Sequence, residues 1–235
     1  MKPEIVFEDL GLMDYRKAWD YQVELYEARV ANKLRNRERP ESEHIYPDNR
    51  LLFVEHPHVY TLGKSGDQNN LLIDSNFLNK IGATYYEIDR GGDITYHGPG
   101  QIVGYPIFDL EQFGMHIKQY VAALEDSVIT TLGCLGIKGD RLQGATGVWL
   151  EPETPRERKI CAIGVKAGRH ITMHGFAFNV NTDLKYFGYI NPCGFLNKGV
   201  TSLEKELGTK QDFTAIKQLL RENLTLRFLN STANN

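Results

Sequence analysis

The sequence predicts an α/β protein built as one mixed β-sheet covered by helices. Strand-like runs outnumber helical ones, and the helical runs lie near the start, the middle and the end of the chain. One sheet with helices packed over it accommodates that order of elements. With 235 residues, no internal repeat and no low-complexity stretch, the chain is expected to form a single domain over residues 1–235.

The N-terminal part begins with a strand over residues 4–9 and a helix that opens at Asp14. Large side chains of this helix recur every three or four positions and are expected to pack into the core: Tyr15, Trp19, Gln22, Tyr26 and Val30. From Ala31 to Arg50 the composition turns to Asn, Arg, Glu and Pro, which indicates a solvated loop or helix end, too short to be a domain linker, as an insertion over 31–50.

Two short strands follow, over residues 51–54 and 59–62. His56 and His58 occupy alternate positions between them, so they share a face and are candidates for a metal pair. The alternative is an ordinary proline turn, because metal sites usually need at least three convergent ligands. Gly63 to Gly66 resembles part of a phosphate loop but lacks the GxxxxGK[ST] spacing, which favours a turn.

A glycine-rich stretch from Arg90 to Pro106 follows a strand over residues 84–88. Its glycines permit positive φ angles and close backbone approach. Residues 93–97 and 101–105 have strand character on either side of a Gly-Pro-Gly turn. We expect a glycine-cut hairpin that brings backbone N–H groups, Arg90 and His97 to the rim of a pocket. A purely structural connector is the alternative.

The remaining elements alternate between helices and strands. A helix over residues 116–135 keeps a 3.6-residue apolar period and ends before Gly136, with Cys134 expected as a small buried residue. Strands over 147–150 and 159–165 are joined by the charged turn 151–158, and a third strand covers 171–180. Helices are expected over 201–207 and 213–228, the second capped by Asp212, and residues 230–235 should form a frayed tail.

Composition excludes several broad classes of protein. A net charge of −3 argues against a general nucleic-acid binder, which needs a dense basic surface. No apolar run approaches the roughly 20 residues that span a bilayer, and the N-terminus lacks the pattern of a signal peptide, so a cytoplasmic protein without a membrane partner is expected. Three cysteines without close spacing suggest neither a disulfide framework nor a zinc site.

Cys193 stands out chemically because it lies between Pro192 and Gly194 on an irregular stretch, where a stiff backbone can present a nucleophile. A thiol with an ordinary pKa of about 8.5 needs a cation or base nearby to become a thiolate at neutral pH. The residues alone leave four candidates unranked: Lys159, His97, His174 and Lys166. A surface lysine at a strand end is the alternative for Lys159, and a core histidine is the alternative for His174.

Several motifs, in this order and spacing, resemble those of the lipoyl(octanoyl) transferase family. They are RGGDITYHGPGQ, KICAIGVK, HGFAFNVNTDL and INPCG, with EHPHVYTLG and GVTSL as further matches. The resemblance covers roughly residues 50–205. It implies an α/β fold shared with the catalytic modules of lipoate and biotin protein ligases. The chain departs from the pattern in its long 31–50 loop and in the charged turn before Lys159.

The resemblance also implies roles for particular residues. Cys193 would form an acyl-thioester intermediate, and Lys159 would lower its pKa and shuttle protons. No cofactor and no metal would be required. Three segments match the family's substrate-binding stretches: Arg90, Gly91, Gly92, Asp93, Ile94, Thr95, Tyr96 and His97; Ala162, Ile163 and Gly164; and Gly175, Phe176 and Ala177. Tyr96 and His97 would form walls of the pocket, and the apolar faces of KICAIGV and GFAFNV would line a slot for an eight-carbon chain.

By the same resemblance, the donor would be octanoyl-acyl carrier protein. The acceptors would be lipoyl domains of 2-oxoacid dehydrogenase E2 subunits and the glycine cleavage H protein. A local basic patch that docks the acidic carrier is a further hypothesis, with four members: Arg156, Arg158, Lys166 and Arg169.

Three rival functions remain on sequence grounds. An ATP-dependent lipoate or biotin-type ligase would not need the cysteine at 193. A non-catalytic acyl-binding relative should lack Cys193 or Lys159, and both are present. A cysteine hydrolase, with His174 or His97 as base, would pass the acyl group to water instead of to a protein lysine.

Overall fold

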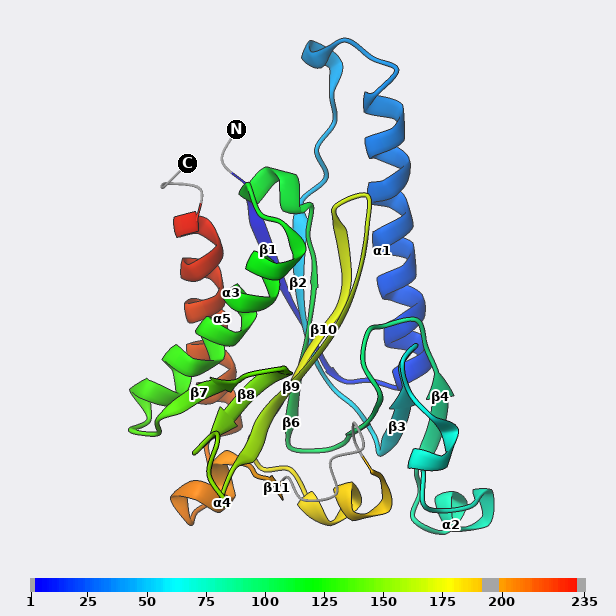
Figure 1. The fold of residues 1–235 in the computed structure, drawn as a ribbon. Coiled ribbons are helices and arrows are strands. Elements are labelled where there is room, and N and C mark those ends of the chain that lie inside the picture. The colour runs from blue at the N-terminus through cyan, green and yellow to red at the C-terminus, as the bar shows by residue number, and fades with distance from the viewer. Residues whose placement is uncertain (1–2, 192–198, 232–235) are drawn as a thin grey trace.

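The computed structural model describes residues 3–191 and 199–231 and contains two β-sheets, the larger of which is covered by helices on both faces (Figure 1). The large sheet has eight strands within these residues. Seven run in the spatial order β1 (Ile5–Leu12), β2 (Asn49–Glu55), β6 (Gln101–Ile107), β10 (Ile171–Asn179), β9 (Arg158–Gly168), β8 (Ala145–Leu150) and β7 (Gly139–Leu142), and β11 (Gly199–Val200) also pairs with β9.

The large sheet is mixed, as the sequence predicts. The β1–β2 and β11–β9 pairs are parallel and the other pairs are antiparallel. In the small sheet, β3 (Val59–Leu62) lies between β4 (Thr84–Glu87), which is parallel to it, and β5 (Ile94–His97), which is antiparallel.

Helices form layers on both faces of the large sheet. In Figure 1, α1 (Tyr15–Asn36) covers one face, and α3 (Ile117–Cys134) and α5 (Phe213–Ser231) lie together over the other. Two short helices, α2 (Ser75–Lys80) and α4 (Leu203–Leu207), and 3₁₀ turns at Glu41–Glu43, Gln68–Asn70, Leu110–Phe113 and Leu184–Tyr189 complete the elements. No helix within the described residues is both long and apolar enough to cross a membrane.

Strand β2 shows why both faces are covered. Leu51 and Phe53 belong to the cluster under α3 and α5, whereas Leu52 and Val54 belong to the cluster under α1. Alternate side chains of a strand point to opposite faces, so an uninterrupted apolar run requires burial on both sides.

Helix ends follow the predicted signals. Asp14 caps α1 by accepting hydrogen bonds from the N–H groups of Arg16 and Lys17. Asp212 likewise accepts from the first turn of α5. His116 caps α3 through a reciprocal pair of hydrogen bonds with Gln119. These side chains satisfy N–H groups that have no partner within the helix.

The prediction of a loop or helix end over Ala31–Arg50 is wrong only at its last two residues. Helix α1 continues to Asn36, and β2 already begins at Asn49. The Asn36 side chain donates to the carbonyl of Ile45 at 2.8 Å and accepts from its N–H at 3.0 Å. These two hydrogen bonds join the loop to the end of the helix. Local composition does not predict such contacts between a side chain and the backbone of another segment.

The predicted hairpin of residues 93–97 and 101–105 is also wrong. The two strands form, but β5 pairs with β3 in the small sheet while β6 pairs with β2 and β10 in the large one. Gly100 has a φ of +82°, and a Cβ there would lie 2.3 Å from the carbonyl oxygen of Asn181. The Gly-Pro-Gly turn therefore passes the chain from one sheet to the other.

Two smaller predictions also need correction. Cys134 is exposed, not buried, because it falls at the solvent-facing end of α3. The expectation of a frayed tail is wrong for residues 230 and 231, which belong to α5. Residues 232–235 lie outside the described residues.

Candidate active site

A cavity of about 510 Å³ lies at the junction of the two sheets. All of the predicted substrate-binding residues line it except Tyr96, and Lys159 lines it as well. The register of β9 and β10 explains much of this convergence, because it sets Ala162, Ile163 and Gly164 directly opposite Ala177, Phe176 and Gly175. Two of the predicted segments, on consecutive strands, thus form one wall.

The Arg90–Asp93 segment forms a second wall through backbone contacts. The Gly91 N–H donates to the Val165 carbonyl of β9 at 2.9 Å. A Cβ on Gly164 would lie 2.8 Å from the carbonyl oxygen of Gly91. These two glycines therefore allow two backbones to approach each other closely.

Arg90 is buried and is anchored by neutral groups. Its guanidinium donates to the carbonyl and the hydroxyl of Thr61, at 2.7 and 3.0 Å, and to the Gly91 carbonyl at 3.0 Å. Arg90 is only 7% exposed while it lines the cavity. It therefore joins the small sheet to the cavity wall.

Histidines around the cavity are held neutral. Burial lowers the pKa of His97 to about 3 and that of His56 to about 4. The His97 ring is within hydrogen-bond distance of Gln101, and the two ring nitrogens of His56 contact the Met13 carbonyl and the Tyr105 hydroxyl. His56 therefore has no nitrogen left for a metal, and the described residues contain no group of three metal-ligating side chains.

Tyr96 does not form the expected cavity wall. Its ring stacks on Tyr186 with centroids 5.0 Å apart, and its hydroxyl lies 2.7 Å from Nδ1 of His58. Burial is the main reason that the His58 pKa is lowered. Tyr96 and His58 thus belong to an aromatic cluster beneath the small sheet. Only the contacts of the folded chain reveal on which side of β5 the tyrosine lies.

His174 is buried in β10 with a φ of +59°. Its Nε2 lies 3.1 Å from an oxygen of Asp89, whose other oxygen accepts from the Lys166 ammonium at 2.5 Å. Burial lowers the pKa of His174, and the hydrogen bonds from His174 and Lys166 lower that of Asp89. Lys166 is thus engaged by a carboxylate and does not line the cavity.

His174 and Lys159 lie toward different ends of the cavity. His174 pairs across the strands with Val165, six residues from Lys159 along β9, which corresponds to about 20 Å at the rise of a β-strand. The two side chains therefore reach the cavity at positions far apart along the same pair of strands.

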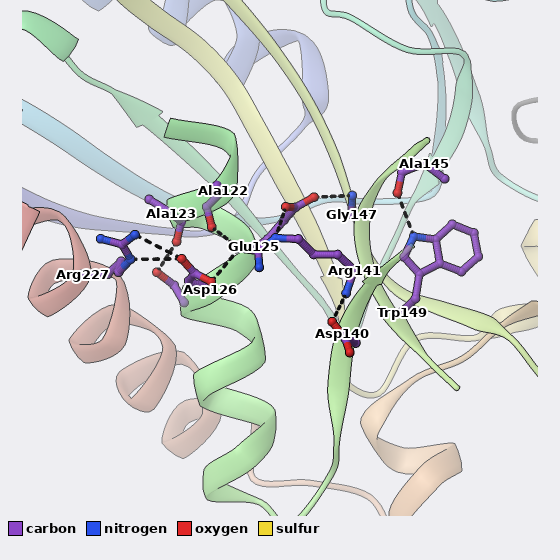
Figure 2. Close-up of polar contacts among 11 residues, drawn as sticks. Ala122, Ala123, Glu125, Asp126, Asp140, Arg141, Ala145, Gly147, Trp149 and Arg227 are labelled. Carbon is purple, nitrogen blue, oxygen red and sulfur yellow. Dashed lines mark hydrogen bonds and ion pairs between the residues drawn. The ribbon is translucent and has the colours of Figure 1, made fainter. Parts of the chain in front are cut away.

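Lys159 sits between two neighbouring strands. It pairs with Trp149 of β8 on one side and with Val200 of β11 on the other. Its Nζ lies 4.6 Å from the centroid of the Trp149 ring. Figure 2 shows how the indole N–H of Trp149 donates to the Ala145 carbonyl, at 3.1 Å. Trp149 was not among the site residues predicted from the sequence. It could have been found from its place in the predicted strand 147–150, which precedes the strand of Lys159.

Cys193 lies outside the described residues, as do Pro192 and Gly194. The described residues that line the cavity nearest to Cys193 in the sequence are Phe187 before it and Gly199 and Val200 after it. The described cysteines offer no alternative nucleophile in the cavity: Cys161 is buried, and burial raises the pKa of its thiol, whereas Cys134 is exposed at the end of α3.

The predicted basic patch is wrong as a single surface. Arg158 and Lys166 are eight residues apart on β9, about 26 Å along the strand. Arg158 pairs with Glu206 at 2.5 Å and Glu151 at 3.0 Å, and Lys166 pairs with Asp89. Arg156 also pairs with Glu151. Carboxylates from nearby and distant parts of the chain thus pair with three of the four predicted cations.

Comparisons with known proteins agree on family and fold. The family model of the lipoyl protein ligase A/B catalytic domain matches residues 14–225. An octanoyltransferase of Cytophaga hutchinsonii is 53% identical over 225 residues, covering 95% of this chain and 92% of that protein. An octanoyltransferase of Flavobacterium johnsoniae is 54% identical over 229 residues, covering 97% and 98% respectively.

Solved structures confirm the predicted fold. A crystal structure of lipoate-protein ligase A bound with ATP superposes with a TM-score of 0.68 at 15% identity, covering 97% of this chain and 85% of that one. The biotin protein ligase of Aquifex aeolicus in complex with biotin and ATP gives a TM-score of 0.52 at 10% identity, covering 96% and 70%. At these identities the similarity shows the fold alone.

Proposed function

Because this chain belongs to the octanoyltransferase family of acyltransferases, we propose that it moves an octanoyl group from octanoyl-acyl carrier protein to a lysine of a lipoyl domain. Cys193 carries the group between the two as a thioester. The acceptors are lipoyl domains of 2-oxoacid dehydrogenase E2 subunits and the glycine cleavage H protein.

The observation that carries this proposal is the cavity that joins Lys159 to an apolar wall. Ile163, Val165 and Phe176 line it beyond the lysine, and each CH₂ group buried against such a wall contributes about 0.8 kcal/mol. A volume of about 510 Å³ is in the usual range for a small-molecule site. A cation at the mouth and apolar side chains along the depth suit a fatty acyl thioester.

In the first half-reaction, the Cys193 thiolate attacks the carbonyl carbon of the octanoyl thioester. The bond between that carbon and the carrier's sulfur breaks, and the departing thiolate takes a proton from the Lys159 ammonium. In the second half-reaction, the amine of the acceptor lysine attacks the Cys193 thioester and gives its proton to Lys159. An amide forms and the Cys193 thiolate is released. Each half-reaction starts from a thioester, so the acyl group is already activated.

The test is acyl transfer without ATP. The protein is mixed with octanoyl-acyl carrier protein, and mass spectrometry follows an octanoyl mass increase on the Cys193 peptide, then its transfer to added lipoyl domain. Cys193→Ser should abolish the thioester, whereas Cys134→Ser should leave it unchanged. Absence of the adduct would refute the proposal. A requirement for ATP would favour a ligase, and release of free octanoate despite the lipoyl domain would favour a hydrolase.

A further inference from the structure

The Lys159 ammonium lies against the face of a buried aromatic ring. Its Nζ is 4.6 Å from the centroid of Trp149, and Trp149 is only 2% exposed. A cation over an indole face is attracted by the negative potential of the ring, and the attraction is strongest where water is excluded. The neutral amine gains no such attraction, so this contact favours the protonated form of Lys159.

The local backbone aims the ring at the lysine. Val148 pairs with Cys161, whereas the next residue of β8, Trp149, pairs with Lys159. A step of one residue along β8 therefore corresponds to a step of two residues along β9. The extra residue lies on β9, and this arrangement is a β-bulge. Bulges redirect side chains and are frequent beside active sites. The hydrogen bond from the indole N–H to the Ala145 carbonyl then fixes the plane of the ring.

A buried carboxylate on α3 holds this part of β8 in place, as Figure 2 shows. Glu125 accepts from the Gly147 N–H at 3.0 Å with one oxygen and from Arg141 at 2.7 Å with the other. Gly147 has a φ of +121°, and a Cβ on it would lie 2.5 Å from the Cys161 carbonyl oxygen and 3.5 Å from Cε of Lys159. The backbone that Glu125 holds thus passes near enough to Lys159 that a side chain at position 147 would touch the lysine.

We infer that Trp149 is a positioning residue that keeps Lys159 protonated in the resting enzyme, with Glu125 holding the strand that carries the ring. This inference rests on the proposed function, in which Lys159 serves Cys193. The resting lysine then acts as an acid: its positive charge stabilises the Cys193 thiolate, and its proton goes to the departing thiolate of the carrier. The neutral amine left behind accepts the proton of the incoming lysine.

Other charged groups around Lys159 also enter its proton equilibrium. They come from the elements packed on β9: Glu125 of α3 with Arg141 of β7 bonded to it, Glu157 and Arg158 before the lysine, Glu151 and Glu206 paired with Arg158, and the buried thiol of Cys161. The inference therefore concerns the change in the Lys159 pKa when only the ring is altered.

The direct test is a titration of Lys159 itself. The protein is labelled with trace acetic anhydride from pH 6 to 11, and the labelling of the Lys159 peptide is measured by mass spectrometry. In Trp149→Leu we expect the pKa of Lys159 to fall by about 0.5 to 1.5 units relative to the wild type, with Trp149→Phe in between. Trp19→Leu is the matched control, because Trp19 also lies against a cation, Arg16, but on α1.

A second experiment tests the inference even if Trp149→Leu does not fold. In a Trp19→Phe background, Trp149 is the only tryptophan, and it can be replaced biosynthetically by fluorotryptophans, which weaken the ring's negative potential at nearly constant shape. The Lys159 pKa should fall further with each added fluorine. An unchanged Lys159 titration in the folded leucine variant, or along the fluorine series, would overturn the inference.

The kinetic consequence separates this role from simple packing. The alkaline limit of the rate of Cys193 acylation should move to lower pH in Trp149→Leu by the same 0.5 to 1.5 units. A packing role would lower the rate equally at every pH, which would contradict the inference. If Cys193 takes up no octanoyl group in the wild type, the proposed function fails, but the labelling experiment still reports on the contact between ring and lysine.

Discussion

Acidification from pH 7 to pH 5 should destabilise this protein mainly through its buried histidines. In the folded state burial lowers the pKa of His97 to about 3 and of His56 to about 4, against about 6.5 in an unfolded chain. Between these values the unfolded chain binds protons that the folded protein does not. The stability contributed by these two neutral histidines is therefore fully present above pH 6.5. It is lost as the pH falls toward the folded-state pKa values of about 4 and about 3.

The size of the effect follows from the proton linkage. At pH 5 each of the two histidines binds a proton in the unfolded state but not in the folded state, which costs about 2 kcal/mol per group relative to pH 7. The pair should therefore lower the free energy of unfolding by about 4 kcal/mol, and His174, whose pKa is also lowered, adds to the loss. Carboxylates with lowered pKa, such as Asp89, lose their contribution only below about pH 4.

Urea unfolding at pH 7, 6 and 5, followed by tryptophan fluorescence, measures this difference. His97→Gln should remove about 2 kcal/mol of the pH dependence, whatever its effect at pH 7. His170→Gln is the control, because the His170 side chain is 55% exposed, and it should leave the pH dependence as in the wild type. Equal free energies of unfolding at pH 7 and pH 5 would refute the reasoning that these histidines are neutral because they are buried.

Three substitutions test other parts of the structure. Gly164→Ala should lower octanoyl transfer at least tenfold in a steady-state assay, because its Cβ would lie 2.8 Å from the Gly91 carbonyl oxygen; wild-type activity would mean that the Arg90–Asp93 wall can move without harm. Asp212→Ala should lower the free energy of unfolding in urea by about 1 kcal/mol, since it removes the N-cap of α5, and an unchanged midpoint would contradict that role. Arg158→Met should destabilise the fold by about 1–3 kcal/mol at pH 7 because it leaves Glu206 without its ion pair. The hydrogen bond from Arg158 lowers the pKa of Glu206 in the wild type, so this loss should shrink in acid as Glu206 takes up a proton; a loss that does not vary with pH would argue against the pair.

Local patterns in the sequence were sufficient for most elements. Alternation and apolar runs predicted β2, β3, β9 and β10, and the 3.6-residue period predicted α3 and α5 with their caps. These signals are local because a strand or helix needs only its own side chains to show which faces are apolar. The motifs from Arg90 to Ala177 likewise identified residues that converge on one cavity, since chemistry at a site restricts residue types as well as spacing.

Contacts between distant segments decided the rest. The partners of β5 and β6, the side on which Tyr96 lies, the neutralisation of Arg158 by Glu206 and the placement of Trp149 against Lys159 all depend on residues far away in the chain. The amino-acid pattern was enough to predict a mixed α/β fold and the motifs of an acyltransferase. Which side chains meet could be known only from the folded chain, because strand pairing and charge pairing depend on the packing of all its segments.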